Sequence, residues 1–249
     1  MNWHPISTSV RPQPETYWLS QALDWLALTD SRSALDVSDG FGEAAAALAA
    51  RGAQVLALIA ESRSDDCRRR FPALKFVSGD ASHFALHNGR DIVFSWMRLA
   101  RMSPSDARSA LSCMARALAD GGELVFETAA ENDEAAVSRA FAEVMAEHGF
   151  PVSGTCWRPA LGEAVHQLEE DGLIITDAAL FACPILLEND DAFLSRLADR
   201  EEKALSKIQD RLTREAILGQ TMEKCRASLR HHHAWCLDGM HLRLRALFR

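Results

Sequence analysis

The sequence lacks any long hydrophobic run. Although 48% of its 249 residues are hydrophobic, no stretch approaches the roughly 20 apolar residues that a membrane-spanning helix needs. The opening segment, MNWHPISTSVRPQPETYW, contains no apolar centre of the kind found in signal peptides. We therefore expect a chain with an ordinary hydrophobic core and no association with a membrane.

Closely spaced cysteine pairs are also missing. Most of the cysteines lie within apolar helix or strand patterns, where a free cysteine behaves as a small hydrophobic residue. This pattern argues against a disulfide scaffold and favours the reducing environment of the cytoplasm. The six cysteines are Cys67, Cys113, Cys156, Cys183, Cys225 and Cys236.

Positive charge is in short supply. The chain has 27 basic and 35 acidic residues, a formal net charge of −8, and such a surface repels the phosphate backbone of nucleic acids. Two local basic runs, CRRRF at 67–71 and RLRALFR at 243–249, are each interpreted as a solvated face or a strand edge, and not as a binding stripe. Nucleic acid is therefore not an expected partner.

Several catalytic and metal-binding motifs are absent as well. The sequence has no GxSxG, HExxH or Walker motif, so hydrolase and nucleotide-hydrolysing functions lack support. The run His231, His232 and His233 cannot direct all three rings to one metal from a helix, because consecutive residues point about 100° apart. With Cys225, Cys236 or His241 added, the spacing still fits no standard zinc site. We interpret the run as a solvated helix end and predict no metal.

Short apolar runs alternate with helical segments in the first 150 residues, and this alternation predicts βαβ units on a parallel sheet. Ser103 is the expected N-cap of one helix, with Pro104 at its first position, and Gly121-Gly122 is expected to end it. The predicted strands are 33–37, 54–58, 74–77, 91–95 and 122–128, and the predicted helices are 42–51, 62–70, 104–118 and 132–148.

The pattern changes after residue 150. A helix at 160–171 leads into an apolar run, LIITDAALFACPILL, and then into two or three amphipathic helices. The alternating segment HAWCLDGMHLRLRALF predicts a long last strand. We predict a single domain over 1–249, with an N-terminal arm and helix at 1–30 and a helical cap at 187–233 over the carboxyl ends of the strands.

The segment ALDVSDGFGEAAAALAARG, residues 34–52, predicts a buried strand, a tight turn and an alanine-rich helix. Ligands of doubly wound sheets bind beside this first turn. Gly40 and Gly42 allow the backbone to approach a ligand and to adopt positive φ, and Asp36 is expected to brace the loop by accepting backbone N–H bonds. A Gly-x-Gly by itself is also compatible with a simple strand-to-helix turn.

The order of strand, GxG turn, helix, strand, SGDA, strand and GGELVFE resembles the class I S-adenosylmethionine-dependent methyltransferases. The C-terminal segments RPALGEAVHQLEEDGLIITDAALFACPILLENDDAFLSRL and AWCLDGMHLRLRALF, with the opening MNWHP, are similar to the trans-aconitate methyltransferase-like group. The resemblance implies a Rossmann-like, doubly wound, mostly parallel seven-stranded sheet with an antiparallel last strand and a helical cap inserted before it. It also implies transfer of the methyl group of S-adenosylmethionine to an oxygen or nitrogen of a small molecule, a carboxylate among the candidates.

The same resemblance implies a set of cofactor-binding positions. Loop residues would hold the methionine part, a carboxylate after the third strand would accept from the adenine amino group, and a small residue would end the fourth strand. The implied residues are Asp36, Ser38, Gly40, Gly42, Ile59, Asp80, Ala81 and Ser95.

Four residues depart from the family pattern. Ser38 replaces the first glycine, and Phe41 replaces a small residue and is large enough to fill part of the cofactor's place. Asp39 adds a negative charge near the cofactor's carboxylate, which is unfavourable unless a cation intervenes. Ile59 stands where the family has an acid for the ribose hydroxyls, which weakens binding by roughly one to three powers of ten. Glu61, two residues farther on, is the acid nearest to this position in the sequence.

Substrate-facing candidates come from three parts of the chain. In SWMRLARM, residues 95–102, Arg98 and Arg101 can bind a carboxylate bidentately, or they can lie on a helix surface. His83 and His87 flank the SGDA turn and are weaker candidates for a proton acceptor. The expected substrate-lining residues are Tyr17, Trp18, Trp96, Arg98 and Trp235.

A second hypothesis keeps the fold without the methyl transfer. The departures at Phe41, Ile59 and 95–102 lie at three separate contact points, which is compatible with loss of the cofactor. The chain would then be a repurposed non-methylating enzyme or a silent subunit, as a homodimer or with a heteromeric partner. The sequence leaves both hypotheses open.

Overall fold

A computed structural model describes residues 14–28, 31–86, 89–152 and 156–249 of the chain. By their internal contacts, these residues fall into two compact units. We call them the sheet unit (14–131, 156–181 and 241–249) and the helical unit (described over 132–152 and 182–240). In the described part of the chain, no helix is both long and apolar enough to cross a membrane.

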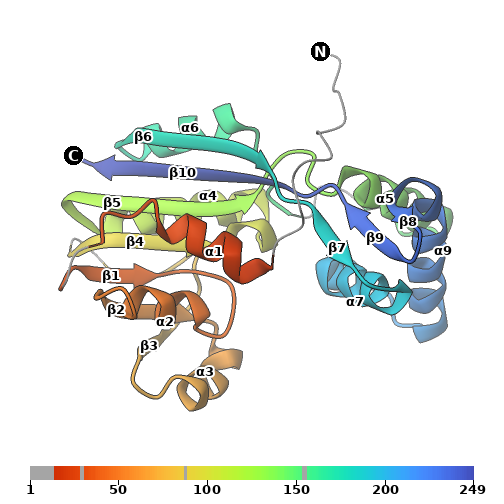
Figure 1. The fold of residues 1–249 in the computed structure, drawn as a ribbon, viewed down its shortest axis with the longest axis horizontal. Coiled ribbons are helices and arrows are strands. Elements are labelled where there is room, and N and C mark those ends of the chain that lie inside the picture. The colour runs from red at the N-terminus through yellow and green to blue at the C-terminus, as the bar shows by residue number, and fades with distance from the viewer. Residues whose placement is uncertain (1–13, 29–30, 87–88, 153–155) are drawn as a thin grey trace. The chain divides into compact units, whose positions relative to one another are not determined.

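The sheet unit contains a seven-stranded sheet with the order β3-β2-β1-β4-β5-β10-β6, which Figure 1 shows from β6 at the top to β3 at the bottom. The pairs from β3 to β5 are parallel, and β10 runs antiparallel to β5. The predicted sheet is thereby confirmed. The strands are β1 (Ser33–Asp36), β2 (Gln54–Ile59), β3 (Lys75–Ser78), β4 (Arg90–Trp96), β5 (Leu118–Ala129), β6 (Leu173–Ala182) and β10 (Met240–Phe248).

Helices cover both faces of this sheet. Apolar residues of α1 and α2 form one core cluster with Ile92, Phe94 and Val125 of the sheet, and α4 packs behind β4 and β5 (Figure 1). The small side chains of Ala44 and Ala45 are buried and let α2 lie close to the strands. The helices are α1 (Glu15–Leu23), α2 (Glu43–Ala49), α3 (Ser64–Arg70), α4 (Pro104–Ala117) and α6 (Leu161–Glu170), with 3-10 turns η1 (Glu61–Arg63) and η2 (Leu99–Arg101).

The start of α4 was predicted correctly and its end to within one residue, but the predicted stop at Gly121-Gly122 is wrong. Ser103 Oγ accepts a hydrogen bond from Asp106 N at 3.1 Å, and Pro104 is the first helical residue. The helix ends at Ala117 and β5 begins at once, so Gly121 and Gly122 lie inside the strand. Gly122 is needed there because a Cβ would lie 2.8 Å from the carbonyl oxygen of Arg90.

The helical unit has its own core and its own small sheet. Three strands pair in the order β7-β9-β8, and the rings of Phe193 and Trp235, whose centres are 4.2 Å apart, belong to a buried apolar cluster. The elements are α5 (Ala135–Glu147), β7 (Ile185–Leu187), α7 (Asp190–Arg200), α8 (Glu202–Leu205), α9 (Arg211–Leu229), β8 (Arg230–His231) and β9 (Ala234–Leu237).

The helical unit is larger than the insertion predicted at 187–233. Val137, Phe141 and Val144 of α5 belong to the same core cluster as α7 and α9, so this helix packs with the insertion. The predicted N-terminal arm falls mostly outside the described residues, and α1 follows it. The single domain and the position of the cap over the sheet stay predictions.

The predicted long last strand is in fact two strands. β9 pairs with β7 and β8, whereas β10 pairs with β5, and Asp238-Gly239 separates them. A Cβ at Gly239 would lie 2.1 Å from the carbonyl oxygen of Cys183, so only glycine fits where these two segments pass. A nearby prediction is also corrected: His231 belongs to β8, and His232 and His233 form the exposed turn of the β8–β9 hairpin, beyond the end of α9.

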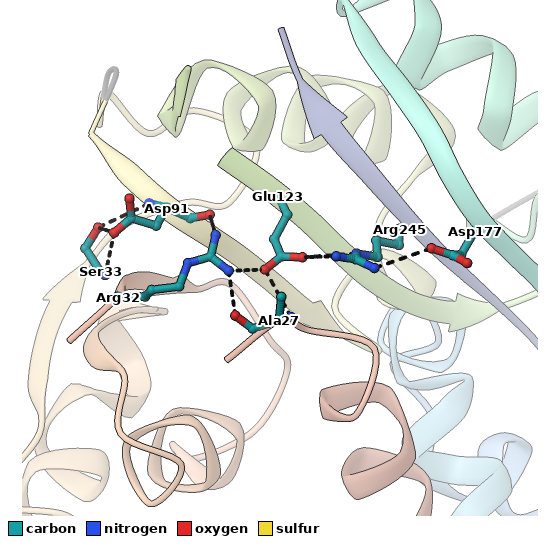
Figure 2. A network of polar contacts seen from close by, with 7 residues as sticks. All are labelled: Ala27, Arg32, Ser33, Asp91, Glu123, Asp177 and Arg245. Carbon is teal, nitrogen blue, oxygen red and sulfur yellow. Dashed lines mark hydrogen bonds and ion pairs between the residues drawn. The ribbon is translucent and has the colours of Figure 1, made fainter. Parts of the chain in front are cut away.

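Charged side chains on β5 and β10 form a polar network across the sheet unit (Figure 2). Glu123 is almost fully buried and contacts Arg32 on one side and Arg245, at 2.9 Å, on the other. Arg245 in turn lies 3.6 Å from Asp177 of β6. The basic run at 243–249 is therefore not merely a strand edge, because Arg243 and Arg245 neutralise acids in the interior. The other basic run is confirmed as exposed at Arg68, Arg69 and Arg70.

Candidate cofactor-binding site

The loop after β1 has the conformation that its glycines predict. Gly40 and Gly42 have φ of 133° and 102°, and Gly42 is the N-cap of α2. A Cβ on Gly42 would lie 3.0 Å from the ring of Phe71 and 3.2 Å from that of Phe76. Two glycines are therefore required to turn the chain from the strand into the helix, whatever the loop binds.

Asp36 braces this loop as expected. Its Oδ1 accepts a hydrogen bond from Ser38 N at 3.0 Å. The side chain is buried, and this burial raises its pKa to about 6, against the opposing effect of the bonds from Ser38 and the charge of Arg98. The loop thus rests on a carboxylate that titrates close to neutral pH.

The segment that follows β1 is joined by hydrogen bonds to the last residues of β4. Ser38 Oγ accepts from Trp96 N at 2.9 Å, and Asp39 N donates to Trp96 O at 2.9 Å. Ser95 Oγ donates to Val37 O at 3.1 Å. β1 and β4 are the neighbours between which the connections diverge to the two sides of the sheet, and ligands of such sheets bind there. Ser38 and Ser95 thus have structural bonds at the expected cofactor position.

Asp39 is surrounded by arginines. Its carboxylate lies 3.0 Å from Arg63 Nη1, 2.6 Å from Arg101 Nε and 3.8 Å from Arg98 Nη1. Arg98 Nη2 also donates to Ser38 O at 2.9 Å. The condition set by the sequence for tolerating Asp39, a nearby cation, is met by three guanidinium groups.

Phe41 lies at the surface of the loop. Its side chain is 39% exposed, and the guanidinium of Arg63 lies over its ring, 4.9 Å from the ring centre. Phe41 N donates to Glu43 Oε2 at 2.8 Å, a bond local to the start of α2. The ring therefore packs at the surface beside an arginine.

The positions after β2 and β3 differ in what they offer. Ile59 is the last residue of β2, is buried and presents no acceptor, while Glu61 is exposed on η1. Asp80 is exposed, and its Oδ1 accepts from Ser82 N at 2.9 Å and from Ser82 Oγ at 2.8 Å. These bonds hold the pKa of Asp80 below its usual value. Asp80 therefore stays ionised as an acceptor beside the buried Ala81.

The substrate-lining candidates are divided between the two units. Tyr17 is 41% exposed and packs edge-on against Trp18, which stacks on Phe181. Trp96 is half-buried against the α1–α2 core cluster. Trp235 lies in the helical unit, fully buried, with Nε1 donating to Asp190 at 3.0 Å, which leaves no ring surface for a substrate.

The structure adds little support for His83 and His87 as proton acceptors. His83 Nδ1 lies 2.7 Å from Ser82 Oγ, so its ring is held by the residue that follows SGDA. His87 lies outside the described residues. Within those residues, no group of three or more histidine, cysteine, aspartate or glutamate side chains is arranged to hold a metal ion.

One polar cluster was missed by the sequence analysis. Glu127 of β5 is fully buried and bonds His241 Nδ1 at 2.7 Å and Arg243 Nε at 2.8 Å. Arg243 Nη1 donates to Gln21 O at 3.0 Å near the end of α1. The signal was present in HLRLR, where alternation puts a histidine and two arginines on one face of the strand.

One segment of the sheet unit matches a known protein family. Residues 34–122, which run from β1 into β5, match the family of methyltransferase domains. The fold around them is the methyltransferase fold. No curated protein sequence matches the chain, so the remaining comparisons are of structure.

Three solved structures share the methyltransferase fold at low sequence identity. BH2331 of Bacillus halodurans C-125, a proposed methyltransferase, is 19% identical with a TM-score of 0.63, over 92% of this chain and 97% of its own. The [4+2]-cyclase SpnF is 18% identical with a TM-score of 0.56, over 93% and 80%. Phosphoethanolamine N-methyltransferase 2 of Haemonchus contortus, in complex with phosphomonomethylethanolamine and S-adenosylhomocysteine, is 15% identical with a TM-score of 0.55, over 96% and 54%. The methyltransferase fold thus occurs with different chemistries.

Proposed function

We propose that this chain is a small-molecule methyltransferase that uses S-adenosylmethionine and transfers its methyl group to an oxygen or nitrogen acceptor. The observation that carries the proposal is the loop after β1, where Gly40 and Gly42 have positive φ and Asp36 braces the turn. The loop lies within the segment that matches methyltransferase domains, at the point of the sheet where such ligands bind.

The residues present fit the cofactor in part. Gly40 and Gly42 carry no side chain between the backbone and a ligand, and Asp80 is an ionised acceptor for the adenine amino group, with Ala81 beside it. Ile59 supplies no acceptor for the ribose hydroxyls. A related fold is solved with S-adenosylhomocysteine bound, which supports the same class of cofactor here. We expect binding, with an affinity reduced by the missing ribose contact.

When bound, the cofactor supplies an activated methyl group on its sulfonium. The task of the protein is then to position the acceptor in line with that group and to exclude water. A carboxylate acceptor is already ionised at neutral pH and needs no catalytic base. The aromatic side chains of Tyr17, Trp18 and Trp96 are the proposed apolar lining for the acceptor.

Calorimetric titration with S-adenosylmethionine tests the proposal. We expect a dissociation constant on the order of micromolar for the wild-type protein. Gly42→Ala should abolish binding because a Cβ meets Phe71 and Phe76 and φ is 102°. Gly162→Ala, in α6 where a Cβ meets nothing within 4 Å, is the matched control and should bind as the wild type does. No heat at millimolar cofactor would contradict the proposal.

The second candidate is a protein of this fold that no longer transfers methyl groups, as an enzyme of other chemistry or as a silent subunit of a homodimer or a heteromeric complex. Two observations favour it: the apolar, buried Ile59 at the end of β2, and the bonds that Ser38, after β1, accepts from Trp96 and Arg98 at the end of β4 and just beyond it. The [4+2]-cyclase SpnF has a similar fold. A folded protein that gives no heat with the cofactor would favour this candidate.

A further inference from the structure

Arginines that follow two strands, β2 and β4, meet at one carboxylate that follows the strand between them. Arg63 follows β2, whereas Arg98 and Arg101 follow β4. Because β1 lies between β2 and β4, Asp39 in the segment after β1 is reached from both sides. We call Arg63, Arg98 and Arg101 the three-arginine cluster.

The cluster has more donors than Asp39 can use. Each guanidinium carries five N–H donors, and the cluster bonds Asp39, Ser38 O and Gly40 O. Three positive charges therefore face one negative charge in direct contact. Asp36 and Asp80 act on Arg98 from farther away.

Two buried donors in the same segment have no acceptor. Arg98 Nε and Trp96 Nε1 are shielded from solvent and lack a hydrogen-bond partner among the described residues. Met97, between them, has a φ of 59°, which is uncommon for a residue other than glycine. Unpaired buried N–H groups are costly and need an explanation. A ligand whose oxygens accept hydrogen bonds from these groups would explain them.

The cluster is accessible from solvent at one end. The side chain of Arg101 is 55% exposed, that of Arg63 32%, and those of Arg98 and Asp39 17% and 13%. An ion that arrives from solvent thus meets Arg101 first. Guanidinium groups bind carboxylate and phosphate oxygens with two parallel N–H bonds, and these are the oxyanions that the cluster suits.

We propose that the three-arginine cluster is an oxyanion-binding site whose resident anion is Asp39, and that a carboxylate or phosphate group of a ligand displaces Asp39. The site does not depend on methyl transfer. It gives the first loop two arrangements, one with Asp39 paired to the arginines and one with the ligand in its place. Asp39 therefore competes with the ligand and selects for groups that bind arginine more strongly than a side-chain carboxylate does.

Anion titrations of matched variants test this inference. Inorganic phosphate and acetate are titrated by calorimetry at constant ionic strength into the wild type, Asp39→Asn, and Asp39→Asn combined with Arg101→Gln. Because Asp39→Asn removes the competing anion, it should tighten binding of at least one anion by roughly tenfold or more. Adding Arg101→Gln should remove the gain, whereas adding Arg69→Gln, an exposed residue on α3, should not.

The two anions distinguish the two ligand classes. A gain with phosphate alone assigns the site to phosphate, and a gain with acetate alone assigns it to carboxylate. If Asp39→Asn is folded by circular dichroism and binds neither anion more tightly than the wild type, the inference is wrong. If that variant does not fold, Arg101→Gln alone must weaken phosphate or acetate binding, and unchanged binding of both overturns the inference.

A separate titration tests the proposed function. S-adenosylmethionine is titrated into the same proteins, and its absence of binding contradicts the methyltransferase proposal while leaving the anion result untouched. Conversely, cofactor binding without any gain in anion affinity supports the methyltransferase and removes the oxyanion site.

Discussion

Asp36 is a buried carboxylate whose burial makes the stability of the fold depend on pH. Its pKa is raised to about 6, above the value of 3.8 for an unperturbed aspartate. Between these two pH values the folded protein holds a proton that the unfolded chain has released. The free energy of unfolding therefore falls by about 3 kcal/mol in total as pH rises through this window. Above about pH 6 this contribution no longer changes with pH.

Asp36→Asn should remove this fall, because asparagine keeps an acceptor for Ser38 N and does not titrate. Urea unfolding at a series of pH values measures it. Asp91→Asn is the control with the opposite sign: hydrogen bonds from Ser33 lower the pKa of Asp91, so its effect is confined to pH values below about 4. An unchanged fall in Asp36→Asn would contradict the prediction.

A substitution at Ile59 gives the most direct test of cofactor binding. We expect Ile59→Asp to raise the affinity for S-adenosylmethionine roughly tenfold or more, because a carboxylate there can accept bonds from the ribose hydroxyls. It should also lower the stability of the free protein, because Ile59 is only 4% exposed. Calorimetry measures the first effect and urea unfolding the second.

The matched variant is Ile59→Asn, which adds polarity without charge and should give a smaller gain. If Ile59→Asp leaves cofactor binding undetectable in a folded protein, the missing acid is not what limits binding. The hypothesis of a fold without methyl transfer would then be preferred.

Among the secondary-structure elements, α4 shows how a local signal determines a boundary. Ser103→Ala should destabilise the protein by about 1 kcal/mol, because it removes the acceptor for Asp106 N at the helix start. Ser103→Asp retains an acceptor and should keep most of the stability. Urea unfolding of the two variants measures the difference, and equal losses would show that the cap bond contributes nothing.

The elements were predictable wherever the signal is local. Ser103 and Pro104 mark a helix start, and Gly40 and Gly42 mark a turn, because each acts through its own backbone. The separation of β9 from β10 was not predictable in this way. The alternation continues through Asp238-Gly239, and the need for Gly239 arises only from its contact with Cys183, a residue remote in sequence.

The candidate site follows the same rule. The brace at Asp36 could be predicted because it bonds a residue two positions away. The arginines around Asp39 could not, because Arg63 and Arg101 come from other loops and only the sheet order brings them together. The sequence did show that Asp39 requires a cation, a condition that charge alone imposes.

Across the sheet unit as a whole, Glu127 joins segments far apart in the chain. Glu127→Gln should destabilise the protein by roughly 3–5 kcal/mol, because it leaves the buried Arg243 without its counter-charge. Urea unfolding measures the loss. Glu215→Gln, in an exposed pair on α9, is the control and should have little effect. A small loss in Glu127→Gln would show that bonds of Arg243 to α1 suffice to hold it.

The place of β10 between β5 and β6 has a consequence for synthesis on the ribosome. Every other strand of the large sheet is translated earlier, so β5 and β6 have no partner on their facing edges until 241–248 emerge. Unpaired edges of this kind recruit other strands and promote aggregation. During synthesis, the facing edges of β5 and β6 can therefore pair with the wrong strand. This ends only when β10 pairs between them.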